Sequence, residues 1–310
     1  MLEFAATRLM RMILTLVAIV TVVFFATRLS GDPLDFIAGE GLSAADRALL
    51  STYYGLDGTL AEQWIRYLAS FLDGNFGISL VERRPVIEVF AERVGPTLQL
   101  VSGAVALTIV LAIPAGVVAA VWRRSWIGTA VMALAFLGYA IPNFVLAIGL
   151  LLVFSFWLGW LPSTGSAGGL HFVLPVVSLA TFYLAGLTRF TRNAMLEVLN
   201  QDYLRTARAK GLPESAVILR HALRNAGITV LSVLGLQIAG LLAAGSVVIE
   251  TVFAWRGIGD LLVGSAIRRD YPVLQFGVLS VAVAVVAINL VVDIAYGVAD
   301  PRIRVSGARA

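Results

Sequence analysis

The sequence predicts an all-α, polytopic membrane protein with six transmembrane helices, and three observations support this fold class. Hydrophobic residues make up 59% of the 310 residues and charged residues only 14%, whereas soluble globular domains carry about 25% charged residues. Several uncharged runs approach or exceed the roughly 20 apolar residues that a helix needs to cross a bilayer. Lysine and arginine gather between these runs in an ordered way, mostly on one side. Water is therefore not the main solvent of this chain.

The first predicted element is a membrane helix over residues 10–28. Arg8 and Arg11 precede it, as basic residues precede the apolar part of a secretory signal peptide. No small-x-small cleavage site follows Phe25, however, so we expect the segment to stay in the protein. Residues 1–29 are thus predicted to form an N-terminal transmembrane helix.

Residues 30–96 predict a small extracytoplasmic helical insertion after the first helix. The segment carries ten acidic and five basic residues, which is too much charge for a membrane span. Its pattern indicates short amphipathic helices at 44–54 and 61–72. Long loops cross the membrane largely regardless of their charge, so this composition agrees with an extracytoplasmic location.

The other five predicted transmembrane helices cover residues 98–121, 132–157, 172–189, 228–250 and 276–298. The third and fourth lie within Ser125–Thr188, a stretch of 64 residues without Asp, Glu, Lys or Arg. Pro142 interrupts this stretch, but a division there would leave two pieces shorter than the roughly 20 residues of a span, so we expect a kink in one helix. Residues 97–301 are predicted to form a five-helix core, and 302–310 a cytoplasmic tail.

The basic residues predict that both termini lie in the cytoplasm. Fourteen of them fall on one side of the six predicted helices: near the N-terminus, after the second helix, between the fourth and fifth, and at the C-terminus. The two short loops on the opposite side carry none and three. The positive-inside rule assigns the richer side to the cytoplasm. This asymmetry explains the pI of 9.7 without nucleic-acid binding.

The cytoplasmic loop 190–226 is the segment that says most about function. Asp202 can cap the N-terminus of a short basic helix, and Gly211 can end that helix in the left-handed conformation. Pro213 suits the first turn of a second helix that would run to Asn225. Such a unit, protruding between two membrane helices, is suited to docking into a groove on a soluble partner. A DNA-binding helix-turn-helix has the same outline, but its tether restricts access to a DNA groove; a merely positive connector is the other interpretation.

Short stretches throughout the chain carry a family resemblance. They are Gly31-Asp32-Pro33, Tyr54-Gly55-Leu56-Asp57, Arg84-Pro85-Val86, Gly159-Trp160-Leu161-Pro162, His221 to Ala226, Asp270-Tyr271-Pro272, and Asn289-Leu290 through Asp300-Pro301-Arg302. In order and spacing, together with loop 190–226, they resemble ATP-binding-cassette importer permeases of the peptide and nickel branch, whose coupling loop is of the EAA type. Two departures stand out. Arg205, Thr206 and Ala207 replace the Glu-Ala-Ala of the general loop, and Arg256 stands where similar permeases usually have proline.

The resemblance implies the role of a permease subunit in an ATP-driven importer of the bacterial inner membrane, working by alternating access. It implies a heterodimer with a second homologous permease, two ATPase subunits that bind ATP and Mg, and an extracytoplasmic solute-binding protein. The implied ATPase-coupling residues are Asp202, Tyr203, Arg205, Thr206, Ala207, Arg208, Lys210, Gly211 and Leu212. Dipeptides, oligopeptides, glutathione and nickel chelates all remain open as substrates.

Catalytic, cofactor and metal sites are not expected within this chain. The sole lysine, Lys210, precedes Gly211 instead of following a glycine-rich phosphate-binding loop, so ATP hydrolysis would come from partner subunits. Cysteine is absent, and His171 and His221 are far apart in the sequence without paired carboxylates nearby, which disfavours a metal site. An intramembrane hydrolase would need a nucleophile with a base or paired aspartates within the helices, and no such set is visible.

Polar residues within the predicted helices are candidates for the solute pathway. Gln99, Asn143 and Gln237 either line that pathway or join neighbouring helices by hydrogen bonds. Asn289 and Asp293 share one helix face, although an ion pair near the cytoplasmic end is the favoured role of Asp293. The alternative function is a secondary transporter not driven by ATP. That class favours an inverted repeat and charged groups near mid-membrane, and the chain displays neither.

Overall fold

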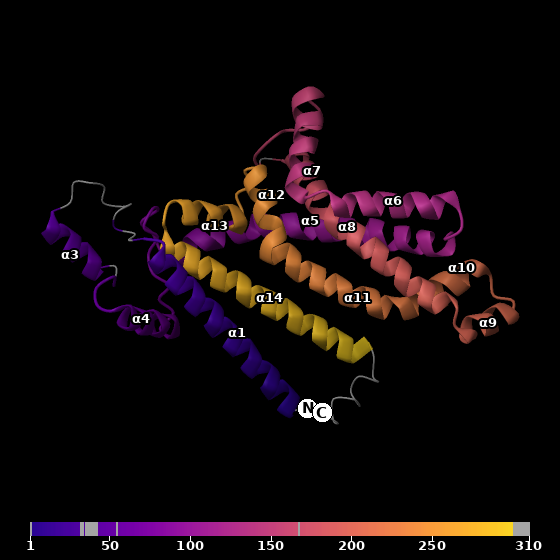
Figure 1. Ribbon diagram of the computed structural model, residues 1–310, viewed down its shortest axis with the longest axis horizontal. Coiled ribbons are helices and arrows are strands. Elements are labelled where there is room, and N and C mark those ends of the chain that lie inside the picture. Colours follow the sequence, from indigo (N-terminus) through magenta and orange to yellow (C-terminus); the bar gives the residue numbers. More distant parts are fainter. Residues whose placement is uncertain (1, 32–33, 35–42, 54, 167, 300–310) are drawn as a thin grey trace. The chain divides into compact units, whose positions relative to one another are not determined.

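All regular secondary structure in the described part of the chain is helical (Figure 1). The computed structural model describes residues 2–31, 34, 43–53, 55–166 and 168–299. The helices are α1 (Leu2–Leu29), α3 (Ala44–Tyr53), α4 (Leu60–Leu72), α5 (Val86–Val121), α6 (Trp126–Ala140), α7 (Asn143–Leu150), η2 (Leu151–Trp157), α8 (Gly169–Leu199), α9 (Asp202–Ala209), α10 (Glu214–Ala216), η3 (Val217–Ala222), α11 (Leu223–Gly240), η4 (Leu241–Gly245), α12 (Ser246–Val252), α13 (Ile258–Ile267) and α14 (Tyr271–Ala299). The label η marks π-helical turns. The predicted tail 302–310 lies outside the described residues, as does the side chain of Asp293.

Within the described ranges, five helices are long and apolar enough to cross a membrane. They are Met10–Leu29, Val86–Val121, Gly169–Leu199, Glu214–Val252 and Tyr271–Val292, the fourth being the continuous run from α10 to α12. Five of the six predicted transmembrane helices lie within α1, α5, α8, α11 to α12, and α14, which confirms them as apolar helices. Their sidedness stays a prediction.

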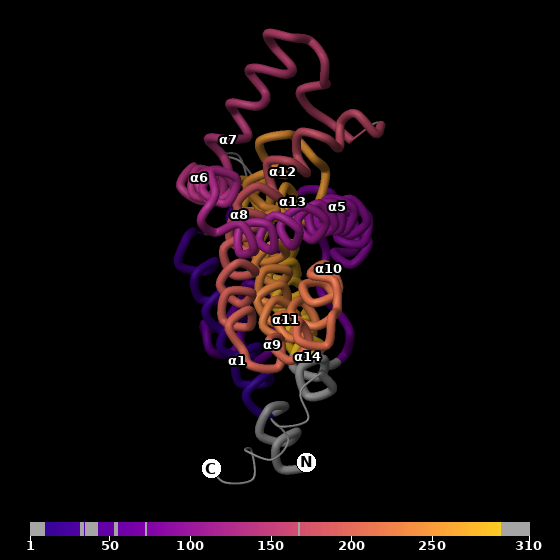
Figure 2. Tube along the Cα trace, turned by 90° about the vertical axis from the view of Figure 1, so that its right-hand side faces the viewer, coloured from indigo at the N-terminus to yellow at the C-terminus, as the bar shows by residue number. Residues whose placement is uncertain are grey.

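The third predicted helix, residues 132–157, is divided rather than kinked. α6 and the helix formed by α7 and η2 meet at an angle of 100°, and Figures 1 and 2 both draw α7 rising away from α6 and α8. Ile141 between them has an extended backbone, with φ −85° and ψ 122°, because the ring of Pro142 clashes with a helical residue before it. The break lies at the predicted position but is sharper than a kink, and counting the bent pair as one span gives six candidate spans.

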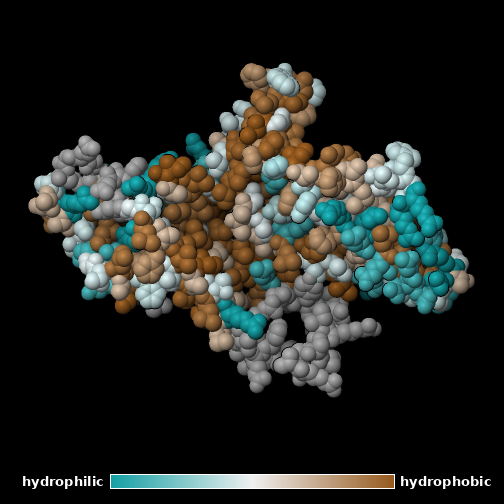
Figure 3. All heavy atoms as spheres, viewed as in Figure 1, coloured by the Kyte–Doolittle hydropathy of each residue, from teal (hydrophilic) through white to brown (hydrophobic). Residues whose placement is uncertain are grey.

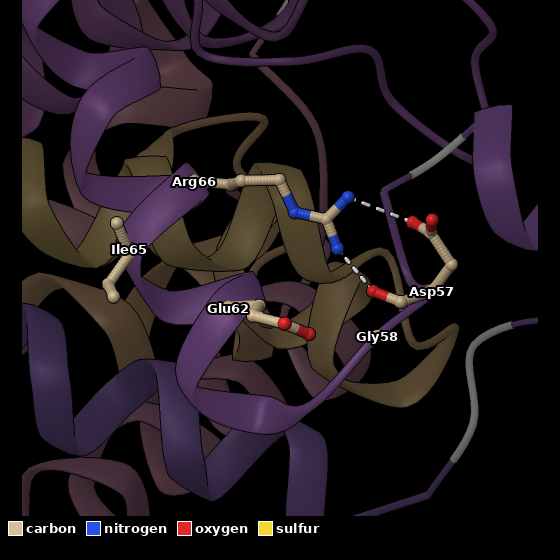
Figure 4. A pocket seen from close by; sticks show the side chains of 5 residues that line it. All are labelled: Asp57, Gly58, Glu62, Ile65 and Arg66. Atoms are coloured by element: carbon tan, nitrogen blue, oxygen red, sulfur yellow. Dashed lines mark hydrogen bonds and ion pairs between the residues drawn. The ribbon is translucent and has the colours of Figure 1, made fainter.

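The predicted insertion helices are present as α3 and α4, whose bounds match 44–54 and 61–72 within a residue. α4 begins with a capping box: the Thr59 hydroxyl accepts from the Glu62 N–H at 3.3 Å, and the Thr59 N–H donates to the Glu62 carboxylate at 2.7 Å. That backbone donor holds the pKa of Glu62 below its ordinary value. Arg66 reaches back to the carboxylate of Asp57 at 3.0 Å and to its carbonyl oxygen (Figure 4).

The chain packs as two compact units, each described by itself. The first unit comprises Met1–Pro96 and Arg256–Val286, and the second comprises Thr97–Trp255 and Ala287–Ala310. The predicted functional division, with its permease core over 97–301, stays a prediction, since compactness alone does not report function.

The first unit is held by an aromatic series and a buried carboxylate. The rings of Phe24, Tyr67, Phe71, Phe76, Phe276 and Phe90 follow one another with centroid distances of 4.7–5.5 Å. Asp270, which is 3% exposed, accepts hydrogen bonds from the Ser79 hydroxyl at 2.5 Å and the Leu80 N–H at 3.0 Å. It thereby fastens the turn that the antiparallel bridge between Ile78 and Pro85 closes.

The second unit is organised around α8, which packs against α6, α7, α11 and α12. α5 approaches α8 closely at Gly116, where an added Cβ atom would lie 2.5 Å from the Cβ of Thr191 and 2.8 Å from the carbonyl oxygen of Thr188. Only glycine permits this approach. The cytoplasmic ends that the sequence predicts for α5 and α8 belong to this unit, and they carry the candidate site.

Candidate functional site

The predicted basic helix of loop 190–226 is α9, and its first residue is Asp202. Asp202 was expected to cap the helix, and this detail was wrong: the N-cap residue is Gln201, whose side chain makes no capping bond. Asp202 instead lies in the first turn, where its negative charge interacts favourably with the positive end of the helix dipole. It forms an ion pair with Arg205 at 3.3 Å, with side chains 92% and 79% exposed.

Gly211 ends α9 as predicted, in the left-handed conformation with φ +78°. The Gly211 N–H donates to the Arg208 carbonyl at 2.9 Å, and the Leu212 N–H to the Ala207 carbonyl at 3.4 Å. These two bonds form a Schellman motif, which satisfies carbonyl groups at the helix end. A Cβ atom on Gly211 would meet no atom within 4 Å, so only the backbone conformation selects glycine here.

The inner face of α9 is anchored to the helices that flank the loop. Leu204 and Ala207 are 0% and 7% exposed and lie in one apolar cluster with Leu187 and Met195 of α8 and Val217 of η3. Burial of one leucine side chain contributes roughly 1.5 to 3 kcal/mol. Because these side chains share one cluster, a displacement of α9 would also shift α8 and the helix that begins at α10.

Two polar contacts add to this attachment. The guanidinium of Arg208 holds the carboxylate of Glu214 across the turn, with Nε to Oε2 at 3.0 Å and Nη2 to Oε1 at 2.8 Å. The amide of Asn225 donates to the Tyr203 hydroxyl at 2.7 Å. Both pairs link α9 to the following helix, so the turn is closed on both sides of Gly211.

The outer face of α9 and its turn is open to solvent. Its exposed residues include Asp202, Tyr203, Arg205, Thr206, Arg208, Lys210, Gly211 and Leu212. The large side chains of Tyr203 and Leu212 are 41% and 39% exposed, and hydrophilic residues gather over this end of the second unit (Figure 3). Of the nine predicted coupling residues, only Ala207 faces inward. Apolar side chains flanked by charge are typical of a surface that docks on another protein.

The second helix of the loop differs from its predicted extent. Pro213 is the N-cap residue of α10 rather than a residue of its first turn. The helix does not end at Asn225 but continues from Glu214 to Val252 as one candidate membrane span. The π-helical turn η3 lies at its start, close to α9. Movement of the turn is therefore connected to a membrane helix without an intervening loop.

The three predicted pathway residues lie apart. Gln99 is an exposed residue of α5, and Asn143 is the half-buried first residue of α7. Gln237 packs against Gly186 of α8, and its Oε1 atom is buried without a hydrogen-bond partner. No hydrogen bond joins any two of them in the ranges that the structure describes. Their assignment to a solute pathway stays a prediction.

Two features of the second unit escaped the sequence analysis. Glu250 in α12 is fully buried and accepts a hydrogen bond from the Thr97 hydroxyl of α5 at 2.7 Å. The sequence feature that could have indicated this residue is a carboxylate directly after the apolar run that ends at Ile249. The guanidinium of Arg189 lies 5.2 Å from the ring centroid of Tyr139, a cation–π contact that no local pattern predicts.

Metal ligation has no candidate set within the described ranges, where no three His, Cys, Asp or Glu side chains are grouped. His171 lies at the start of α8, with Nδ1 buried and unpaired, and His221 lies in η3.

Comparison with known proteins found relatives that match nearly the whole chain. The chain is 42% identical over 305 residues to the glutathione transport system permease protein GsiC of Shigella flexneri serotype 5b, covering 98% of this chain and 99% of that protein. The identity to GsiC of Salmonella paratyphi A is 43% over the same length. The solved methionine ABC transporter MetNI, in an inward-facing form, matches with a TM-score of 0.61 at 18% identity, over 69% of this chain and 97% of that one.

The family match covers the part of the chain that contains the loop. Residues 112–305 match the family described as the binding-protein-dependent transport system inner membrane component. The apolar helices agree with a multi-pass protein of the bacterial inner membrane. From the family match and the identity over the whole chain, this protein belongs to the inner membrane permeases of binding-protein-dependent ABC transport systems.

Proposed function

We propose that the chain transmits ATPase movements to a solute pathway through residues 202–213, which we call the coupling segment. The observation that carries this proposal is the two-sided character of α9. Its inner face, with Leu204 and Ala207, is packed into the membrane helices, while its outer face is exposed. A segment built in this way can receive a partner on one side and pass its displacement to α8 and the α10 to α12 helix on the other.

The proposed complex contains four further subunits. A second homologous permease completes the pathway, and two ATP-binding-cassette subunits bind ATP and Mg and dock on the coupling segments. An extracytoplasmic solute-binding protein delivers the solute, in keeping with the family description. The exposed Tyr203 and Leu212 offer apolar contacts to the ATPase, and the charged side chains around them would determine orientation.

The proposed substrates are peptides or peptide-sized solutes, with glutathione as the first to test. This choice is supported by relatives that share 42–43% identity over 98% of the chain and are named for glutathione transport. Dipeptides, oligopeptides and nickel chelates are the other members of the proposed class. The solute-binding protein would contribute much of the selection, because a wide pathway needs few fixed contacts.

Reconstitution in proteoliposomes tests the proposal. The complete complex should accumulate labelled glutathione or dipeptide only with ATP and Mg, and an ionophore that collapses ion gradients should leave uptake unchanged. The chain alone should neither hydrolyse ATP nor transport. Uptake that persists without ATP and stops with the ionophore would identify a secondary transporter instead and refute the proposal.

A further inference from the structure

An open groove of about 680 Å³ lies beside the coupling segment, within the second unit. Its lining comes from the end of α5, the turn into α6, the end of α8, α9, α10 and η3. The lining residues that matter here are Trp122, Arg123, Arg124, Arg205, Arg208 and Glu214. Segments far apart in the sequence therefore contribute to one surface.

The groove carries a surplus of positive charge. Four guanidinium groups line it and only one carboxylate, Glu214, which is already engaged by Arg208. Arg205 pairs with Asp202 at 3.3 Å, but its side chain stays 79% exposed. Arg123 and Arg124 are exposed and make no ion pair with any described residue. At least two cations are thus available to an anionic ligand.

Two tryptophans favour a position of this groove at the level of lipid headgroups. Trp122 at the end of α5 and Trp126 at the start of α6 are 51% and 79% exposed. Exposed tryptophan at the ends of apolar helices is typical of the membrane–water interface. The basic residues put the same ends on the predicted cytoplasmic side, where anionic lipids attract clustered cations.

We propose that this groove binds the headgroup of an anionic phospholipid. Guanidinium groups match phosphate oxygens in a bidentate way, and the acyl chains would lie along α5 and α6 past the two tryptophans. A zwitterionic lipid offers the same phosphate but adds a cation, which the surplus positive charge disfavours. Because Arg205 and Arg208 belong to α9, the lipid would link the turn between α5 and α6 to the coupling segment.

Native mass spectrometry of the full-length chain in detergent tests this binding directly. Dioleoylphosphatidylglycerol and dioleoylphosphatidylcholine are titrated against the wild type and against the double variant Arg123→Gln/Arg124→Gln. The matched control is Arg220→Gln/Arg224→Gln, which removes two exposed arginines outside the groove. We expect the groove variant to bind phosphatidylglycerol roughly 30-fold more weakly, since each cation near an anionic surface contributes roughly fivefold. The control and the wild type should both prefer phosphatidylglycerol.

Three outcomes would overturn the proposal. The first is equal retention of the two lipids by the wild type, and the second is equal loss of phosphatidylglycerol in the groove variant and its control. The third is displacement of the lipid by millimolar inorganic phosphate, which would identify a soluble anion as the ligand. Arg123→Lys/Arg124→Lys keeps the charge and should restore most of the preference, so a folding defect in the glutamine variant would not obscure the result. Binding in this assay does not depend on the proposed transport function.

Discussion

The coupling segment, which ends in the turn at Gly211, and the turn between Ile78 and Pro85 are fastened in opposite ways. The 78–85 turn is stabilised by a residue that is distant in the sequence, the buried Asp270, whose carboxylate accepts hydrogen bonds from Ser79 and Leu80. The coupling segment is fixed by contacts of α9 with its flanking helices, and the space beside Gly211 is open. A buried polar fastening makes a turn rigid, whereas an anchored inner face with a free outer face lets a segment move as a unit with its membrane helices.

The largest expected effect comes from removal of the buried fastening. Asp270→Ala leaves the Ser79 hydroxyl and the Leu80 N–H without their acceptor, and each unsatisfied buried donor costs about 1–3 kcal/mol. We expect the free energy that holds the 78–85 turn closed to fall by roughly 2–6 kcal/mol. Tryptic cleavage at the adjacent Arg83 in the purified protein should accelerate accordingly.

Two variants sharpen this prediction. Asp270→Asn keeps one acceptor oxygen and should give an intermediate cleavage rate. Asp73→Ala removes an exposed carboxylate of the same unit and should leave the rate unchanged. Cleavage of the Asp270→Ala protein at the wild-type rate would mean that the carboxylate does not fasten the turn.

The second expected effect concerns the backbone of the coupling segment. Gly211→Val places a β-branched residue at φ +78°, where strain costs about 1–3 kcal/mol. Relief of that strain would reorient the corner at Leu212 and Pro213, and we expect transport to be lost while membrane insertion and the amount of protein are retained. Uptake and substrate-stimulated ATPase activity in proteoliposomes measure this effect.

Gly211→Asn is the matched control, because asparagine tolerates the left-handed conformation far better than valine does. Lys210→Ala changes only an exposed charge of the same turn and should also be mild, since exposed ion pairs contribute about 0–1 kcal/mol. Wild-type uptake and ATPase activity in the Gly211→Val complex would show that the segment only connects two helices and does not couple ATP hydrolysis to transport.

The smallest expected effect belongs to the ion pair of Arg208 and Glu214. Its side chains are 39% and 55% exposed, so a double-mutant cycle with alanine should give a coupling energy of about 0–1 kcal/mol. The value should fall further in high salt, because exposed charges are screened. Thermal unfolding of the four proteins measures it. A coupling energy of several kcal/mol would show that this turn, like the 78–85 turn, depends on one polar fastening.

Patterns that act locally were readable from the sequence. The apolar runs identified five of the membrane helices, and the φ > 0 turn at Gly211 followed from a glycine placed before Leu212-Pro213. A bend at Pro142 was also predicted, but its angle of 100° was not, because the length of an apolar run does not report the geometry of the residue before proline. α13 was missed because it is a short apolar helix of ten residues inside a region taken as a loop.

Contacts over long sequence distance were not readable. Asp270 and Ser79 are separated by 191 positions, and Glu250 and Thr97 by 153. The sequence around each residue does not identify its partner, because the contact depends on how the helices pack. The same holds for the anionic-lipid groove. Its arginines come from the turn between α5 and α6 and from α9, about 80 residues further along the chain, and show only as separate basic residues in a positive-inside pattern.

Site-directed cross-linking tests the central claim most directly, because the chain contains no cysteine. Thr206→Cys places a thiol on the exposed outer face of α9, and Ala61→Cys places one on α4 of the insertion. In the assembled complex, with a bifunctional maleimide and single cysteines introduced in the ATPase, the thiol at position 206 should cross-link to the ATPase subunit and the yield should change with ATP. The thiol at position 61 should give no such product. Equal yields from the two positions, or none from position 206 in an active complex, would contradict the account.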